Sequence, residues 1–377
     1  MPVQAPWSRI PAVPAAIGFA GGILSASFGA SVWVAALAAC VGAALWLWRP
    51  ARFFASLPVA LAIGFMAAAC EPRSAVPSEP PAAREGLLNT IYTSPLDGPA
   101  AAFVATTVVA DSRYLAPALR DDFRGAGIAH ILALSGFHAG IVAMLVMWLT
   151  RPMLAAGRAR MLRPVVVLAA VWAFAALGGF SPSIVRASVM LSLLSGARLL
   201  GRYTSTLNAL AVAALAILAW RPSALFDVGF LLSFGAVGGI LAFAGPLNPF
   251  DRRTRPRLHA AASLVAVPLG ATLATAPVVA GVFGSLPLMF LPANMLVAVL
   301  FAPFYVVALA VVLLSACGLP CALLARLAEM LYALMATAAD SLASSISVAP
   351  SVAAVATFYF ALVSALILLR RHRPRAG

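Results

Sequence analysis

Long apolar runs separated by short polar segments dominate this chain. A membrane-spanning helix needs about 20 mostly apolar residues, and about a dozen segments approach that length. Several of them are short or contain glycine, so the pattern predicts an all-α polytopic transmembrane bundle of about 10–12 spans. The expected spans lie near residues 13–30, 32–48, 53–70, 127–149, 164–179, 184–198, 205–220, 226–244, 258–283, 286–315, 320–346 and 352–369.

The stretch between the third and fourth expected spans has a different pattern. Residues 71–86 are rich in proline and charged residues, which predicts an extracytoplasmic linker. Residues 87–126 mix apolar positions with too many charges for a span, so we expect two amphipathic helices on the outer membrane–water boundary. The predicted parts are N-terminal transmembrane helices (1–70), the linker (71–86), interfacial helices (87–126) and a transmembrane core (127–377).

Composition agrees with a membrane protein, and the charges predict its orientation. Of the 377 residues, 63% are hydrophobic and 10% are charged, with 25 basic and 11 acidic residues giving a net charge of +14. Cytoplasmic loops of membrane proteins are enriched in arginine. Both termini are therefore expected in the cytoplasm, with the first segment retained as an anchor, and topology explains most of the positive charge. The arginine clusters that agree with this orientation lie within residues 49–52, 151–163, 198–202, 252–257 and 370–375.

Every basic residue is arginine, because the sequence contains no lysine. A P-loop needs a lysine that reaches the terminal phosphates, and a Schiff-base enzyme needs a lysine amine, so both are excluded. The four cysteines and four histidines lack the spacing of disulfide or metal sites. We expect no cofactor and no metal, and an energy source in an ion gradient or a partner.

The densest polar cluster inside an apolar run lies between Gly127 and Gly140. His130, Ser135 and His138 are costly in hydrocarbon, so we expect them to line a polar interior, and the glycines predict a break in the helix. The alternative is that Ser135 bonds to its own helix and both histidines lie at the interface.

Two later regions also carry polar groups inside apolar runs. Arg186 follows a Ser-Pro-Ser break and either faces a polar lumen, where it suits a phosphate, or extends to the outer surface. Ser233 and the glycines near it predict close helix packing, and Asp227 is expected to pair with a nearby arginine. Prolines at 268–303 are expected to interrupt two segments around Asn294, giving discontinuous helices or kinks.

In order along the chain, these motifs resemble the ComEC competence family. The resemblance covers residues 87–345 and implies an inner-membrane channel, not an enzyme, that passes single-stranded DNA into the cytoplasm during natural transformation. The motifs are His130-Ile-Leu-Ala-Leu-Ser-Gly-Phe-His138, Ser181-Pro-Ser-Ile-Val-Arg186-Ala-Ser-Val-Met190, Gly229-Phe-Leu-Leu-Ser-Phe234, Ala274-Thr-Ala-Pro277 and Pro292-Ala-Asn294.

A single strand crossing the membrane needs donors for its phosphates and faces on which its bases stack. The candidate donors are His130, Ser135, His138, Arg186, Ser233 and Asn294, and the candidate stacking faces are Phe137, Phe180, Phe230 and Phe234. The resemblance also implies membrane lipids, an extracytoplasmic DNA receptor, a cytosolic helicase or ATPase, a separate nuclease and a homo-oligomer as partners.

This chain departs from the family pattern in three places. Residues 71–86 stand where fuller members carry an OB-type domain, and no metallo-β-lactamase-like metal motif follows the last span. Leu231 replaces a glutamine of the family motif, which removes an amide. Two other functions stay open: a secondary transporter or lipid-handling protein that uses broken helices, and an intramembrane serine hydrolase that uses Ser135 and His138.

Overall fold

The computed structural model describes residues 12–27, 60–61, 63–64, 82–155, 159–199, 205–251 and 253–371. Helices make up most of this part, and its strands form a single two-stranded sheet. The predicted all-α class is therefore confirmed. The expected span at 32–48, most of 53–70 and the first part of the 71–86 linker lie outside the described residues.

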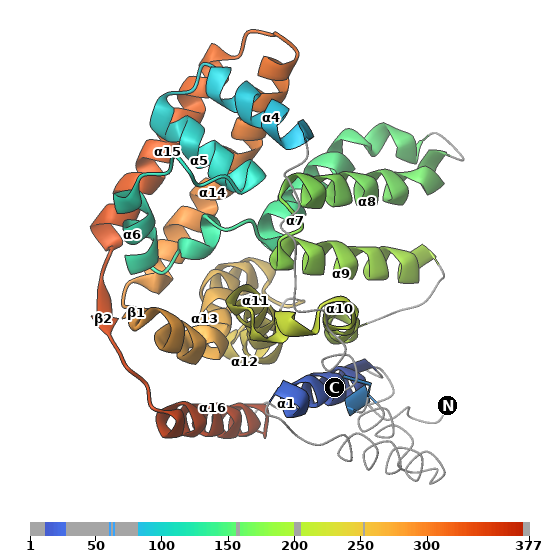
Figure 1. Cartoon of the computed structure of the whole chain (residues 1–377), viewed down its shortest axis with the longest axis vertical. Helices are drawn as coiled ribbons and strands as arrows, with labels where there is room; N and C mark the ends of the chain where they lie inside the picture. Colours follow the sequence, from blue (N-terminus) through green and yellow to red (C-terminus); the bar gives the residue numbers. More distant parts are fainter. Residues whose placement is uncertain are drawn as a thin grey trace. The chain divides into compact units, whose positions relative to one another are not determined.

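Every apolar segment predicted after residue 126 contains a helix (Figure 1). The first expected span corresponds to α1 (Ala12–Ser27). The later helices are α7 (Gly136–Leu149), α8 (Ala159–Leu177), α9 (Pro182–Leu199), α10 (Thr206–Trp220), α11 (Val228–Gly239), the π-helical η6 (Ile240–Ala244), α12 (Gly245–Leu247), α13 (Pro256–Phe283), α14 (Phe290–Ala316), α15 (Ala322–Leu342) and α16 (Val352–Arg371). Short 3-10 turns form η3 (Ala129–Ile131), η4 (Arg151–Leu154) and η5 (Pro222–Phe226).

Four helical stretches of the described part are long and apolar enough to cross a membrane: 228–247, 256–283, 290–316 and 322–342. Seven further apolar helices have 10–17 residues. The total of 10–12 spans stays a prediction. A helix of 10–17 residues is shorter than the hydrocarbon layer, so it crosses only with the help of flanking residues or a locally thinner bilayer.

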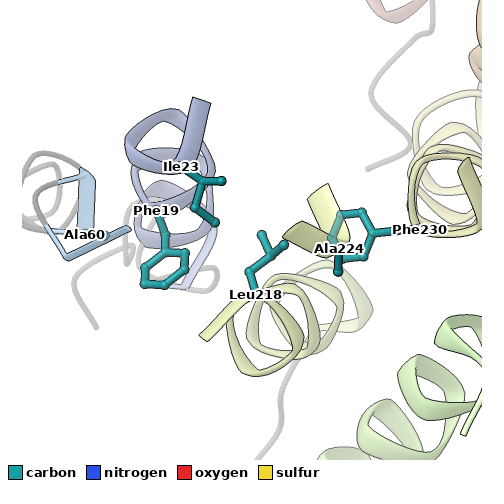
Figure 2. Close-up of a cluster of buried hydrophobic side chains, with 6 residues drawn as sticks. All are labelled: Phe19, Ile23, Ala60, Leu218, Ala224 and Phe230. Carbon is teal, nitrogen blue, oxygen red and sulfur yellow. The ribbon is translucent and has the colours of Figure 1, made fainter. Parts of the chain in front are cut away.

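The chain divides into two compact units. The first unit comprises residues 1–79, 164–168 and 185–234, and the second comprises 80–163, 169–184 and 235–377. In the first unit α1 packs against α10 and η5. Figure 2 shows the apolar cluster that joins these elements. Its buried members are Phe19, Ile23, Ala60, Leu218, Ala224 and Phe230.

The second unit is built around the antiparallel pair α14 and α15. The helices α4 (Ala82–Thr93), α5 (Gly98–Val109) and α6 (Pro117–Gly125) pack against this pair (Figure 1). The prediction of two amphipathic helices in 87–126 was wrong, because three helices form and the first begins at Ala82. All of residues 100–109 of α5 are buried, so this helix has no polar face and belongs to the core. Whether this layer lies at the membrane boundary stays a prediction.

Of the two alternatives predicted from the prolines, discontinuous helices are wrong for α13 and α14, while kinks stay a prediction. Pro268 and Pro277 lie inside α13, Pro303 lies inside α14, and both helices continue through them. Neighbouring helices in a membrane bundle compensate for the backbone bonds that proline removes. Pro287 lies outside both helices, in strand β1 (Ser285–Pro287), which pairs antiparallel with β2 (Ser345–Ser347).

Candidate functional site

The predicted break before residue 136 is present and is closed by a polar cap. Ser135 is extended and α7 begins at Gly136. The Oγ of Ser135 accepts a hydrogen bond from the Phe137 amide (3.3 Å) and lies 2.9 Å from Nδ1 of His138, which also accepts from the Ser135 amide (3.2 Å). These contacts satisfy amides that a helix N-terminus otherwise leaves unpaired.

The same contacts favour one tautomer of a neutral His138 ring. In a neutral imidazole one nitrogen accepts and the other donates. In the tautomer in which Nδ1 accepts the backbone amide, the serine hydroxyl also donates to Nδ1 and the proton lies on Nε2. Nε2 is buried and has no hydrogen-bond partner among the described residues. Ser135 thus bonds within its own helix end, as one alternative expected, whereas His138 is buried and not at the interface. That these groups line a polar interior stays a prediction.

His138 packs against aromatic side chains of α14. Its ring meets Phe301 and Tyr305 edge-on, with centroids 4.9 and 5.0 Å apart. Tyr305 is fully buried, and its hydroxyl, like Nε2 of His138, has no partner within the described part of the chain. The exposed Phe137 lies beside Phe301 at 6.0 Å. Sequence reasoning missed Tyr305, although a tyrosine inside an apolar run is a usable signal.

Asn294 lies on the same helix, but its side chain is used locally. Its Nδ2 donates to the Phe290 carbonyl (2.6 Å) and more weakly to the Gly127 carbonyl (3.5 Å). Gly127 has φ +76°, and a Cβ there would lie 2.8 Å from atoms of Phe290 and Pro287. α14 therefore positions both ends of the 127–138 motif. His130 lies in η3 with an exposed side chain and is near enough to His138 for an electrostatic interaction.

A second set of candidates meets in the first unit. The guanidinium of Arg186 on α9 lies over the ring of Phe234 on α11, 5.5 Å from its centroid, and Phe234 stacks on Phe230 at 4.3 Å. Arg186 is only 6% exposed. Its Nη1 has no hydrogen-bond partner, and no ion pair of Arg186 is found, among the described residues. This arrangement is a buried cation on an aromatic face.

The other candidates of this region have mainly structural contacts. Phe230 belongs to the apolar cluster of Figure 2, and Ser233 is half-buried on α11. Asp227 pairs with Arg221 at 3.4 Å, as expected, and also accepts from the Gly229 amide at the start of α11. In the second unit, Phe180 is exposed and has a left-handed backbone, with φ +52°.

The described residues contain no group of three or more His, Cys, Asp or Glu side chains placed to hold a metal ion. Cys317 is exposed and Cys321 is buried, and neither forms a disulfide bond. The candidate groups are thus hydrogen-bond donors and aromatic faces. The four long apolar helices of the described part, with polar groups buried among apolar helices, indicate a membrane protein with a helical bundle.

Comparison with known proteins gives the family. Residues 107–372 match the family model described as "Competence protein", so the chain belongs to the competence protein family. This confirms the resemblance inferred from the motifs.

Two curated relatives match parts of the chain. Competence protein ComA of Neisseria gonorrhoeae is 36% identical over 181 residues, which cover 45% of this chain and 26% of ComA. ComE operon protein 3 of Bacillus subtilis (strain 168) is 26% identical over 202 residues, 54% of this chain and 24% of that protein. The matches thus span about a quarter of the length of each relative. No solved structure matches the chain.

Proposed function

We propose that this chain forms a translocation unit for competence DNA uptake and passes single-stranded DNA across the bacterial inner membrane, with both termini in the cytoplasm. The family supports the general role, and two of its curated relatives carry competence in their names or in their operon designation. The proposal does not require catalytic chemistry in the chain.

The observation that carries the proposal is Arg186 over Phe234. A buried guanidinium without a carboxylate is costly in a membrane bundle, and such a group is usually retained for a ligand. A guanidinium offers a fork of donors to phosphate oxygens, and a phenylalanine ring offers a face to a base. The guanidinium supplies the donors, whereas the Phe234 ring is covered by Arg186 and lies against Phe230, so a base would stack on it only by displacing one of these groups.

The hydrolase alternative rests on the distance of 2.9 Å between Ser135 Oγ and His138 Nδ1. The pair, however, closes the start of α7, and in a Ser-His-Asp arrangement the second ring nitrogen is held by an orienting group. Nε2 of His138 lacks such a partner in the described part. A fluorophosphonate probe that labelled the wild-type protein but not Ser135→Ala would favour the hydrolase over the channel.

The transporter or lipid-handling alternative relied on broken helices near Asn294. Since α13 and α14 continue through their internal prolines, the expected discontinuity is confined to the 284–289 connection. Solute flux in proteoliposomes that is independent of DNA would favour this alternative.

The energy for transport is proposed to come from outside the chain, since no lysine is available for a P-loop. A cytosolic helicase or the membrane gradient would pull the strand, and an extracytoplasmic receptor and a nuclease would deliver it. A homo-oligomer and surrounding lipids complete the proposed assembly.

Deletion of the gene tests the function directly. Labelled donor DNA is added to wild-type, deleted and complemented cells, and the DNA that becomes resistant to external nuclease inside the cytoplasm is measured together with transformation frequency. We expect both to fall by orders of magnitude on deletion and to return on complementation. Unimpaired transformation after deletion would refute the proposed function.

A further inference from the structure

Arginine and tyrosine side chains gather on one surface of the second unit, and none of them is among the candidates described above. The surface is formed by α4, the α5–α6 connection and the first turns of α6. It belongs to the region that the sequence predicts to lie on the outer face, as linker or at the membrane–water boundary. We call it the Arg–Tyr surface, and its members are Arg84, Tyr92, Arg113, Tyr114 and Arg120.

The two tyrosines form an exposed pair. Their ring centroids are 5.4 Å apart and their planes meet at 80°. Tyr114 is 69% exposed and Tyr92 is 37% exposed, so ring surface of both is open to solvent. Nucleic-acid bases that are free of a duplex stack on exposed aromatic rings regardless of their sequence.

Two arginines near this pair, Arg84 and Arg120, are held by backbone carbonyls. Arg84 Nε donates to the Val109 carbonyl at 3.2 Å, and Arg120 Nη2 donates to the Ser112 carbonyl at 3.3 Å. A carbonyl holds a guanidinium in place without neutralising it, and a guanidinium has five N–H donors. Each therefore has donors left for phosphate oxygens.

Arg113 anchors the connection between α5 and α6. Its Nε and Nη2 donate to the carboxylate of Asp111 at 2.8–3.1 Å. The Arg113 side chain is 68% exposed whereas that of Asp111 is 3% exposed, so the cation lies outside the anion. The hydrogen bond from Arg113 lowers the pKa of Asp111, so the carboxylate stays charged further into the acidic range than a free one. Of the nearby acidic groups, Asp121 pairs with Arg124 at 3.5 Å and Glu85 follows Arg84 on α4.

We propose that the Arg–Tyr surface binds single-stranded nucleic acid, with bases on Tyr92 and Tyr114 and phosphates on the arginines, and so receives the strand on the outer side of the membrane. The inference rests on the proposed function. Bases inside a duplex are already stacked and offer no free face, so the surface discriminates against duplex DNA.

Binding of a fluorescent oligo-dT to the purified full-length protein in detergent tests this assignment. Affinity is measured by fluorescence anisotropy as a function of salt concentration, with duplex DNA as a competitor. We expect Tyr114→Ala to bind at least about fivefold more weakly, since a stacked base contributes about 1–3 kcal/mol, and Tyr114→Phe to bind like the wild type. Arg120→Gln should reduce the salt slope by about 0.7, the value for one phosphate contact on a single strand.

Three controls separate the surface from general charge and from folding. Arg257→Gln makes the same charge change on α13, at an exposed position predicted to be cytoplasmic, and should leave the slope unchanged. Glu85→Gln removes a negative charge and should strengthen binding. Elution profiles and thermal midpoints of the exposed variants Tyr114→Ala and Arg120→Gln verify folding.

Unchanged affinity in Tyr114→Ala and Arg120→Gln would overturn the inference, as would equal competition by duplex DNA or no binding by the wild type. Loss of an associated protein without loss of oligo-dT binding would assign the surface to a protein partner instead. None of these results would alter the outcome of the deletion experiment, which tests the proposed function separately.

Discussion

Replacing Arg186 with methionine distinguishes a residue kept for function from one kept for stability. The guanidinium is buried over Phe234, with Nη1 unpartnered in the described part of the chain. A buried unsatisfied donor costs about 1–3 kcal/mol, whereas a cation–π contact contributes about 0.5–2 kcal/mol. Methionine fills similar space without a charge, so the balance favours the variant by about 1 kcal/mol.

We therefore expect Arg186→Met to unfold at the same temperature as the wild type or a higher one, and to lose DNA uptake. The thermal midpoint of the purified protein in detergent and the transformation frequency of cells carrying the variant are the two measurements. Arg186→Lys retains the charge without the fork of donors and should keep part of the uptake. Arg257→Met makes the same change at an exposed position and should leave uptake intact.

Two results would refute this reasoning. A loss of more than about 2 kcal/mol of stability in Arg186→Met would exceed the cation–π contribution and would show that the arginine holds the unit together. Normal transformation with Arg186→Met would show that the buried cation does not serve the strand.

Three further predictions concern the second unit. Ser135→Ala removes the oxygen that caps α7, so we expect the free energy of unfolding to fall by about 1 kcal/mol. Ser135→Thr keeps the oxygen and is the control. An unchanged thermal midpoint of Ser135→Ala would contradict the role of the cap. Gly127→Ala places a Cβ 2.8 Å from Phe290 and Pro287 at φ +76° and should cost at least about 2 kcal/mol, whereas Gly140→Ala meets open space and should cost nothing. The pKa of Asp111 is lower in the folded protein than in the unfolded chain because of its bonds to Arg113. Its stabilisation is thus present above the unfolded pKa of about 3.9 and is lost as the pH falls through the lower folded value. In Asp111→Asn the thermal midpoint should therefore depend less on pH in the acidic range than it does in the wild type. The same pH dependence in both proteins would refute the role of Asp111.

The helices were predictable wherever an apolar run was long, because backbone groups in lipid must be satisfied within the helix. The break before Gly136 and the pairing of Asp227 with Arg221 followed from local residues. The burial of α5 did not, since a 12-residue apolar run is too short for a span and its burial depends on α14 and α15. The prolines of α13 do not end the helix, because local helix propensity yields to tertiary packing.

Contacts between distant segments were also invisible in the sequence. Gly127 and Asn294 are separated by 167 positions, and only the packing of α14 brings them together. Arg186 and Phe234 were each candidates, but nothing in their spacing indicated that one ring would lie against the other. Hydrophobic periodicity locates elements and gives no pairing between them.

The positive charge of the chain therefore has two origins that its total does not distinguish. Clusters such as 252–257 agree with cytoplasmic retention, whereas Arg84 and Arg120 are fixed by carbonyls and Arg186 by a ring. A guanidinium held by a neutral group loses little entropy when it binds an anion, and its field is not cancelled by a carboxylate. With only 11 acidic residues in 377, neutral partners are a consequence of composition. Under the proposed function, the composition that is predicted to orient the helices also leaves fixed cations for a polyanion, and we expect their contribution to its binding to weaken as salt rises.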